Sequence, residues 1–320
     1  MKPLYLVVAI IIFLLVILTA VTVFFFNFAI VGKRLSKENA IKRAKNHKVY
    51  KTYADRIVNG IEWISNCKQK HVEIKSYDNI KLFGTLIEAE EKTDNTVILF
   101  HGWTSRGFFD FSCIIEMYHK NGFNVLMPDQ RAHGMSGGKY TCFGVKERYD
   151  VISWVNYVIS LYGENCKIVI EGISMGASTV LMAAGLSDLS PRVKGIIADC
   201  GFTSAADQFA HVLKKDYHLP PFPFLYTANL LTRMIAGFGF WDVNATEEVK
   251  KSELPLLIIH GEDDDFVPVK FGRQIYEASA SENKQIITVP GAKHGMSYFN
   301  DEEHCRSVLE NFLKNVFENQ

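Results

Sequence analysis

A serine at position 174 lies between an apolar run and a helix-forming run, and this arrangement restricts the fold more than any other feature of the sequence. The run KIVIE at 167–171 favours a buried strand, and ASTVLMAA at 177–184 favours a helix. The turn between them, GISMG at 172–176, has glycines where side chains would collide with the strand and the helix. Such a turn pushes a hydroxyl clear of a sheet, although a glycine-rich turn also suits phosphate binding.

Two later segments supply the groups that would activate a serine. A serine hydroxyl is a weak nucleophile, so a neutral imidazole must accept its proton and a carboxylate must orient that imidazole. Carboxylates follow the apolar run LLII at 256–259, in HGEDDDFVP at 260–268, and a histidine follows QIITV at 285–289, in PGAKHG at 290–295. The order Ser174, an aspartate and then His294 predicts a nucleophile, an acid and a base at one edge of a parallel sheet.

With these motifs the chain resembles the α/β-hydrolase superfamily of serine hydrolases, in particular its lysophospholipase-like and esterase-like members with a small helical cap. The resemblance runs from about residue 72 to the C-terminus. It implies that Asp264, three residues before the valine of the HGEDDDFVP segment, is the catalytic acid. Asp263 and Asp265 are the next alternatives, and Asp199, at the end of another apolar run, is a further one.

The same resemblance implies an oxyanion hole made of two backbone amides. One belongs to Met175, directly after the nucleophile, and the other to Trp103 in FHGWT at 100–104. Losing one such donor typically costs about two to three orders of magnitude in rate. The segment PDQRAHGMSG at 128–137 also resembles a family signature, and we interpret it as the floor of the site, without a chemical step.

Most of the ten histidines are predicted to be structural or solvated. His101, His133 and His260 stand near strand ends, where structural hydrogen bonds are expected. The other histidines outside the site are His47, His71, His119, His211, His218 and His304. Neither a His-Glu-x-x-His motif nor paired Cys-x-x-Cys motifs occur, so we expect no metal site and no cofactor.

Alternating apolar strands and helical patterns predict an α/β fold, with a mostly parallel doubly wound sheet and an antiparallel hairpin at its edge. The hairpin is expected at residues 71–75 and 80–86, around the turn YDN at 77–79. Parallel strands are predicted at residues 96–100, 123–127, 167–170, 193–198, 256–259 and 286–289. Helices are predicted at residues 109–121, 146–162, 175–186, 269–279 and 302–317.

One connection, at about residues 204–252, is too long for a simple crossover and predicts a helical cap inserted into the hydrolase domain of residues 71–320. Its middle is rich in large apolar side chains, which pack the cap onto the core and also wall a pocket above the serine. An apolar acyl or aromatic group is therefore the expected substrate moiety. The apolar residues are Leu219, Phe222, Phe224, Leu225, Tyr226, Leu230, Leu231, Met234, Ile235, Phe238, Phe240 and Trp241.

Residues 4–31 form a nearly uninterrupted apolar run, and about 20 residues suffice to cross a bilayer. We predict an uncleaved transmembrane anchor preceding the α/β domain. A cleaved signal peptide would have a shorter apolar core, and this run continues past the small residues TAVT at 19–22. A buried helix of the globular part is the other alternative.

The basic residues that follow this run bear on the orientation of the anchor. Residues 32–70 are predicted to be a basic juxtamembrane helical segment, able to contact anionic lipid headgroups. The positive-inside rule puts this flank in the cytoplasm, and six scattered cysteines fit reduced thiols better than a disulfide framework. We therefore favour a single-pass membrane protein whose catalytic domain faces the cytoplasm, while export of the large C-terminal domain stays open.

These features predict a membrane-anchored serine hydrolase that cleaves a small-molecule or lipid carboxylic ester through an acyl-enzyme. Peptide or amide hydrolysis, thioester hydrolysis and acyl transfer by the same residues stay open. A membrane-tethered binding protein that keeps the fold without turnover is the alternative from another class. The 35 basic and 35 acidic residues cancel, so nucleic acid is not an expected partner. The sequence indicates no oligomeric state.

Overall fold

The computed structural model of the chain describes residues 2–318 and has one eight-stranded sheet at its centre. The strand order is β1-β2-β4-β3-β5-β6-β7-β8. β2 pairs antiparallel with both β1 and β4, and every other pair is parallel. The strands are β1 (Gln69–Lys75), β2 (Lys81–Ile87), β3 (Asn95–Phe100), β4 (Asn124–Pro128), β5 (Lys167–Ile173), β6 (Val193–Asp199), β7 (Leu256–Gly261) and β8 (Lys284–Val289).

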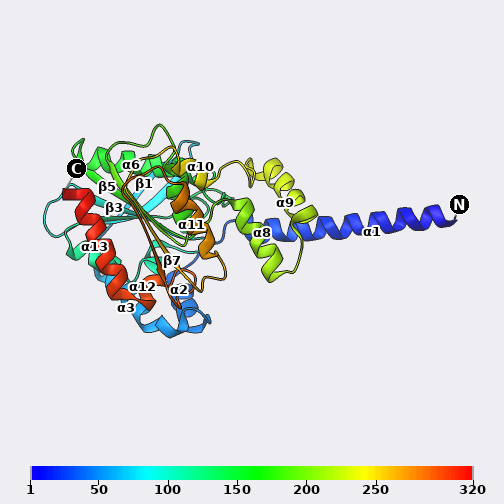
Figure 1. Cartoon of the computed structure of the whole chain (residues 1–320), viewed down its shortest axis with the longest axis horizontal. Helices are drawn as coiled ribbons and strands as arrows, with labels where there is room; N and C mark the ends of the chain where they lie inside the picture. Colours follow the sequence, from blue (N-terminus) through cyan, green and yellow to red (C-terminus); the bar gives the residue numbers. More distant parts are fainter. Residues whose placement is uncertain (1, 319–320) are drawn as a thin grey trace.

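Helices cover both faces of this sheet (Figure 1). One buried cluster packs side chains of α6, α7 and α11 on one face, and a second cluster packs α3, α5 and α13 on the other. The predicted α/β fold with its antiparallel edge hairpin is confirmed. The helices are α1 (Lys2–Phe25), α2 (Lys37–Asn46), α3 (Ala54–Asn66), α4 (Gly107–Asp110), α5 (Ile115–Lys120), α6 (Glu147–Tyr162), α7 (Met175–Ala183), α8 (Ala205–Asp216), α9 (Pro221–Ala236), α10 (Ala245–Val249), α11 (Val269–Ala278), α12 (Ser297–Asn300) and α13 (Glu302–Glu318).

The single helix predicted at residues 109–121 is wrong, because this stretch divides into α4 and α5. Phe111 and Ile114 leave the helical backbone conformation, and both bury their side chains, with 0% and 3% exposed. Packing beneath the sheet therefore overrides the local helical pattern. α3 packs closely against the turn between α4 and α5, because a β-carbon on Gly60 would lie 2.0 Å from the Ser112 carbonyl oxygen.

The segment of residues 32–70 folds against the domain. It contains α2, the short 3-10 helix η2 (Lys51–Tyr53) and α3. Ala40 and Ala44 of α2 and Ile57 of α3 are fully buried against Phe109 and Phe299. The basic stretch predicted to lie along the membrane is thus held on the surface of the hydrolase domain beside the C-terminal edge of the sheet.

The N-terminal helix projects away from the domain (Figure 1). Residues Leu4–Ile30 are long and apolar enough to cross a membrane, and 6% of the most apolar stretch is buried. This exposure contradicts the alternative of a buried helix of the globular part. α1 continues into a π-helix, η1 (Phe26–Ile30), whose Phe26 and Ile30 side chains are buried in the domain.

The long connection between β6 and β7 carries α8, α9 and α10, as the predicted insertion requires. Ser204 begins α8 by accepting a hydrogen bond from the Asp207 amide. α9 lies beside the end of α1, where the Thr22 and Thr227 hydroxyl oxygens are 2.7 Å apart (Figure 1). The insertion and the N-terminal helix therefore form one packed unit.

Candidate active site

Ser174 lies at the sharp turn between β5 and α7. Its backbone has φ 57° and ψ −117°, a conformation that costs energy for a residue with a β-carbon. Its amide donates to the Asp199 carbonyl oxygen over 2.8 Å, and this hydrogen bond ties the turn to β6. A β-carbon on Gly172 would lie 2.2 Å from the Gly176 carbonyl, and one on Gly176 would lie 1.9 Å from the Phe100 oxygen. The two glycines permit the turn because no other residue would fit.

The structure brings Ser174, His294 and Asp264 together in one hydrogen-bonded chain. The Ser174 hydroxyl and His294 Nε2 are 2.8 Å apart, and His294 Nδ1 and Asp264 Oδ2 are 2.7 Å apart. This arrangement requires the tautomer in which Nδ1 carries the proton and Nε2 accepts one from serine. The other Asp264 oxygen accepts hydrogen bonds from the amides of Phe266 and Val267, so the carboxylate is held in place.

The alternative acids lie elsewhere. Asp263 is exposed, and Asp265 is exposed and pairs with Lys215 at 2.9 Å. Asp199 is fully buried at the end of β6, and its carboxylate faces the Ser297 hydroxyl at 3.5 Å. Among the described residues, Asp264 is the only acid whose carboxylate accepts a hydrogen bond from His294.

The charges of the pair shift both pKa values. Burial opposes ionisation of Asp264, but His294 and His260 outweigh it and hold the pKa of this carboxyl well below its usual range. Burial also opposes protonation of His294, and the Asp264 carboxylate outweighs it, so the pKa of His294 is raised. Asp264 is therefore an anion near neutral pH, as a group that orients and stabilises an imidazolium must be.

Trp103 and Met175, whose backbone amides are the predicted oxyanion donors, line the same pocket as Ser174. The turn after β3 is fixed on both sides of Trp103, because the Gly102 amide donates to Asp110 over 2.7 Å and the Thr104 amide donates to His133 over 3.1 Å. Within residues 2–318, neither the Trp103 amide nor the Met175 amide donates to a protein acceptor. Both remain available for an oxygen of the substrate.

The segment of residues 128–137 supports this turn. The Gln130 amide donates to His101 Nε2 over 3.0 Å, and the buried Arg131 pairs with Asp150 at 2.7 Å. His101 and His133 lie side by side, with ring centroids 5.0 Å apart, and both bond to backbone groups. His260 likewise bonds the Val267 carbonyl oxygen. These contacts give the three histidines the structural surroundings expected of them.

Two pockets of opposite character meet at Ser174. The first is almost entirely apolar, and its wall combines the insertion with the end of the N-terminal helix. The second, here called the polar pocket, mixes apolar side chains with cationic and anionic ones, and the α2–η2 segment forms part of it. Residues that define the apolar pocket are Phe25, Phe28, Phe143, Phe209, Phe224 and Phe240, and those that define the polar pocket are Arg43, Lys48, Tyr50, Asp110 and Lys293.

Sequence reasoning missed the contributions of residues 25–30 and 43–50 to these pockets. Two signals were present. The apolar run exceeds the roughly 20 residues that a bilayer needs, so part of it was free for another role. The basic stretch also contains apolar residues at helical spacing, Ala40 and Ala44, which now pack on the domain.

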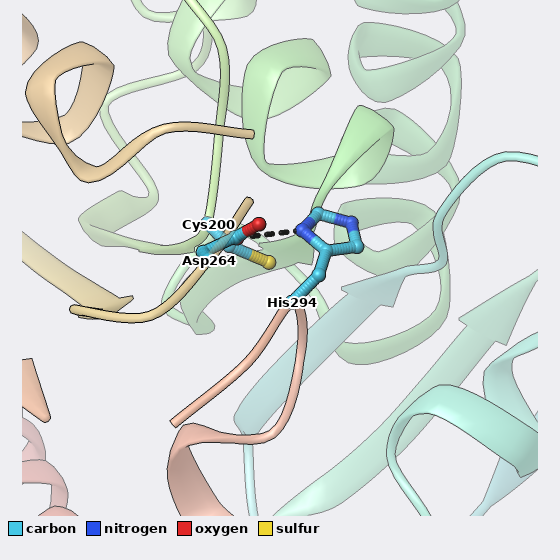
Figure 2. Close-up of side chains that lie close together, drawn as sticks. All are labelled: Cys200, Asp264 and His294. Carbon is cyan, nitrogen blue, oxygen red and sulfur yellow. Dashed lines mark hydrogen bonds and ion pairs between the residues drawn. The ribbon is translucent and has the colours of Figure 1, made fainter. Parts of the chain in front are cut away.

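Cys200 lies beside Asp264 and His294, and the three could in principle hold a metal ion (Figure 2). Their ligand atoms lie within 4.8 Å of one another. However, the hydrogen bond between His294 and Asp264 already occupies two of these atoms, and burial holds the pKa of the Cys200 thiol well above its usual range. Metal binding requires a thiolate, so the arrangement favours the hydrogen-bonded triad over a metal site.

A family comparison agrees with the geometry. The model of the prolyl oligopeptidase family matches residues 109–320. The chain belongs to this family. Its fold and its esterase-like relatives make it a hydrolase of the α/β-hydrolase superfamily. The stretch matched includes Ser174, Asp264 and His294.

Individual relatives cover most of the chain. It is 33% identical to the uncharacterized protein YqkD of Bacillus subtilis, over 71% of this chain and 74% of YqkD. It is 26% identical to the uncharacterized membrane protein YNL320W of Saccharomyces cerevisiae, over 80% and 85% of the two chains. The crystallised esterase Pf2001 of Pyrococcus furiosus superposes with a TM-score of 0.65 and 30% identity, covering 80% of this chain and 93% of the esterase.

Proposed function

We propose that the protein is a membrane-anchored serine hydrolase that cleaves a carboxylic ester with an apolar acyl or aromatic moiety. The observation that carries this proposal is the hydrogen-bonded chain from Ser174 through His294 to Asp264, with distances of 2.8 and 2.7 Å. Nucleophilic catalysis by serine requires a base within hydrogen-bonding reach and a third group that orients the base. The family relationship to hydrolases supports the same chemistry.

In the proposed reaction, the Ser174 oxygen attacks the ester carbonyl carbon while its proton moves to His294 Nε2. The carbonyl oxygen becomes an oxyanion that accepts hydrogen bonds from the Met175 and Trp103 amides. His294 then gives the proton to the leaving alcohol, and an acyl-enzyme remains. Water, deprotonated by His294, attacks the acyl-enzyme and releases the carboxylic acid and free Ser174.

The two pockets suggest how the substrate lies. The acyl or aromatic moiety occupies the apolar pocket, where burial of each methylene contributes about 0.8 kcal/mol. The leaving alcohol occupies the polar pocket on the other side of Ser174. Arg43, Lys48 and Lys293 line that pocket, and none of the three pairs with a carboxylate in the part of the chain that the structure describes. Asp216 and Asp265 also line it, but both pair with Lys215, so the three cations favour a polar or anionic group on the leaving side.

The membrane part of the proposal rests on the N-terminal helix. Residues 4–31 form the anchor, residues 71–320 form the hydrolase domain, and residues 204–252 form its cap. The length and exposure of Leu4–Ile30 support the anchor, as does the relative named as a membrane protein. The side of the membrane on which the domain lies follows from the positive-inside rule and from the six scattered cysteines, which fit reduced thiols, and both favour the cytoplasm.

Labelling with a fluorophosphonate tests the proposed nucleophile. We expect one label per molecule by intact mass, absent from the Ser174→Ala variant, and turnover of p-nitrophenyl esters that peaks at one acyl chain length. The same variant should lose this turnover. Full esterase activity in Ser174→Ala would refute the assignment, and folded protein that never labels would favour a binding protein without turnover.

A second candidate activity, hydrolysis of a peptide or amide bond, is favoured by the family match itself. Both reactions pass through the same tetrahedral intermediate. Matched p-nitrophenyl esters and p-nitroanilides with the same acyl group would distinguish them. A ratio of kcat/KM values that favours the anilide would replace the esterase proposal with this one.

A further inference from the structure

We propose that the outer face of α9, formed by Phe222, Tyr226, Leu230 and Met234, inserts into the bilayer that α1 crosses, so that the acyl chain of a membrane-resident ester passes directly from the lipid into the apolar pocket. This inference rests on the proposed function for the identity of the pocket. It adds a lipid-binding surface, a route of entry and a substrate class, namely long-chain esters that reside in the bilayer.

The outer face of α9 is unusually apolar for a surface. Tyr226, Leu230 and Met234 recur every four residues on the helix, with exposed fractions of 55%, 59% and 75%. Phe222, 72% exposed, precedes them at a kink and packs its ring edge-on against Tyr226 at 5.8 Å. Single exposed apolar residues are ordinary, whereas a contiguous stripe on one element marks an interaction site. The opposite face of the helix is already used, because Leu225, Ala228, Thr232 and Ala236 are buried on the domain.

The position of this face relative to α1 identifies the bilayer as its partner. About 20 helical residues cross the hydrocarbon core, so a span that begins at Leu4 ends near Val23. At that point α1 meets the cap. Thr22 contacts Thr227 of α9 at 2.7 Å, and the Phe25 ring packs edge-on against Tyr217 at 4.8 Å. α9 thus lies beside α1 at the level where the span ends (Figure 1), which brings its exposed apolar side chains to the boundary of the bilayer.

Aromatic residues mark the boundary of the proposed lipid-facing surface. Trp241 is 48% exposed, and its ring lies 5.2 Å from that of Tyr226. Tryptophan and tyrosine favour the interface between hydrocarbon and headgroups. Lys33 Nζ lies 4.3 Å from the Phe28 ring centroid, where a cation that follows the span would meet the headgroups.

The apolar pocket connects the same two elements to the nucleophile. Phe25, Phe28 and Ala29 at the end of the N-terminal helix line it, and so do Phe224, Leu225 and Ala228 of α9. Ser174 lines the same pocket. A chain that moves from the bilayer along α1 and α9 meets apolar walls throughout, so it reaches the serine without crossing water.

Depth-dependent quenching tests the insertion directly. Full-length protein in phosphatidylcholine vesicles carries an environment-sensitive fluorophore at Met234→Cys, and the control carries it at Asn315→Cys, an exposed position of α13 on the far side of the domain. Lipids with a quencher on the acyl chain should quench the Met234 label at least threefold more than the Asn315 label. Equal quenching at both positions would overturn the insertion. Shielding of the Met234 label from the lipid quencher by a bound protein would overturn it too.

Turnover tests the route of entry. In vesicles, the double variant L230E/M234E should hydrolyse a long-chain, membrane-resident ester at least tenfold more slowly than the unaltered protein. It should hydrolyse p-nitrophenyl acetate within twofold, because this ester arrives from water. The matched variant K314E, which adds an acidic group on α13, should leave both rates unchanged. Equal loss on the two esters would contradict lateral entry.

The two measurements distinguish failure of the proposed function from failure of the membrane insertion. Ester turnover would then be insensitive to Ser174→Ala, while quenching of the Met234 label would be unaffected because it depends on the α9 surface alone. Quenching without Ser174-dependent turnover refutes the catalytic proposal, and turnover without quenching refutes the membrane-inserted cap.

Discussion

The chemistry of the proposed site depends on how one carboxylate controls one imidazole. His294 must be neutral to accept the Ser174 proton, and Asp264 raises the pKa of His294. In the unaltered protein, kcat/KM therefore declines as the pH falls through this raised pKa. Asp264→Asn removes the anion, so the pKa of His294 decreases and the acid limb of the kcat/KM profile moves to lower pH.

We expect the same variant to lose about three to four orders of magnitude in kcat, because the imidazole loses the partner that fixes its tautomer. The pH profile of p-nitrophenyl ester hydrolysis measures both effects. Asp263→Asn is the matched control, since Asp263 is exposed beside Asp264. An unshifted acid limb in Asp264→Asn would mean that another group sets the pKa of the base.

A second buried carboxyl, Glu171 of β5, predicts a pH dependence of stability. Burial raises the pKa of Glu171 to about 8, and the Tyr118 hydroxyl donates to it. Through Glu171 the folded protein therefore binds up to one proton more than the unfolded chain between about pH 4.5 and 8, and the buried Asp199, whose pKa is raised to about 7, acts in the same direction. In this window the free energy of unfolding falls as the pH rises, by up to about 1.4 kcal/mol per pH unit.

Glu171→Gln should reduce this slope by the contribution of Glu171, because the amide does not titrate, and should increase stability at pH 8 relative to the unaltered protein. Chemical denaturation in detergent at several pH values measures the slope. Glu303→Gln, an exposed residue of α13, controls for the loss of one acidic group. The same slope in Glu171→Gln and in the unaltered protein would assign it to another group.

At the scale of elements, the α2–η2 segment predicts a preference for anionic leaving groups. Lys48 and Lys293 line the polar pocket on the leaving side of Ser174. We expect K48E/K293E to raise KM for an ester of glycerol phosphate by about three- to tenfold, because each exposed charge contributes about 0.2–1 kcal/mol. KM for the matched glycerol ester, with the same acyl chain, should stay within twofold. Parallel steady-state assays at low salt measure both, and equal changes would contradict an electrostatic role.

Some of the helices and strands could be predicted from the sequence alone and others could not. The strands ending near Ser174, Asp264 and His294 were predictable, because apolar runs followed by polar turns share one edge of a parallel sheet. The division of the helix at 109–121 was not, since Phe111 and Ile114 keep a helical pattern while packing bends the backbone.

The residues that line the pockets could not be predicted from local sequence patterns either. Phe28 and Arg43 reach the site from segments far from Ser174 in the sequence, and their position follows from tertiary packing of α1 and α2. A hydropathy profile identifies an apolar helix without indicating which of its residues leave the lipid. That distinction requires the contacts of Thr22, Phe26 and Ile30 with the domain.

At the scale of the whole molecule, the N-terminal helix serves two roles that truncation should separate. Removal of residues 1–20 deletes most of the proposed span but keeps Phe25 through Ile30 in the pocket wall. We expect this variant to retain turnover of p-nitrophenyl butyrate in detergent. Removal of residues 1–31 deletes part of the wall, and we expect at least a tenfold loss of kcat/KM.

Circular dichroism and thermal unfolding should accompany both truncations, so that loss of the wall is distinguished from loss of the fold. Equal activity of the two folded variants would show that residues 21–31 contribute nothing to the site.

The contact between Trp103 and Ala29 connects the proposed oxyanion hole to the end of the proposed membrane anchor. The Trp103 indole donates to the Ala29 carbonyl oxygen over 3.1 Å, and the Trp103 amide is one of the two proposed oxyanion donors. A thinner or stretched bilayer changes the tilt of a spanning helix. If α1 spans the membrane as proposed, such a tilt changes the force on Trp103, whose amide is a proposed oxyanion donor, and we expect turnover to depend on bilayer thickness.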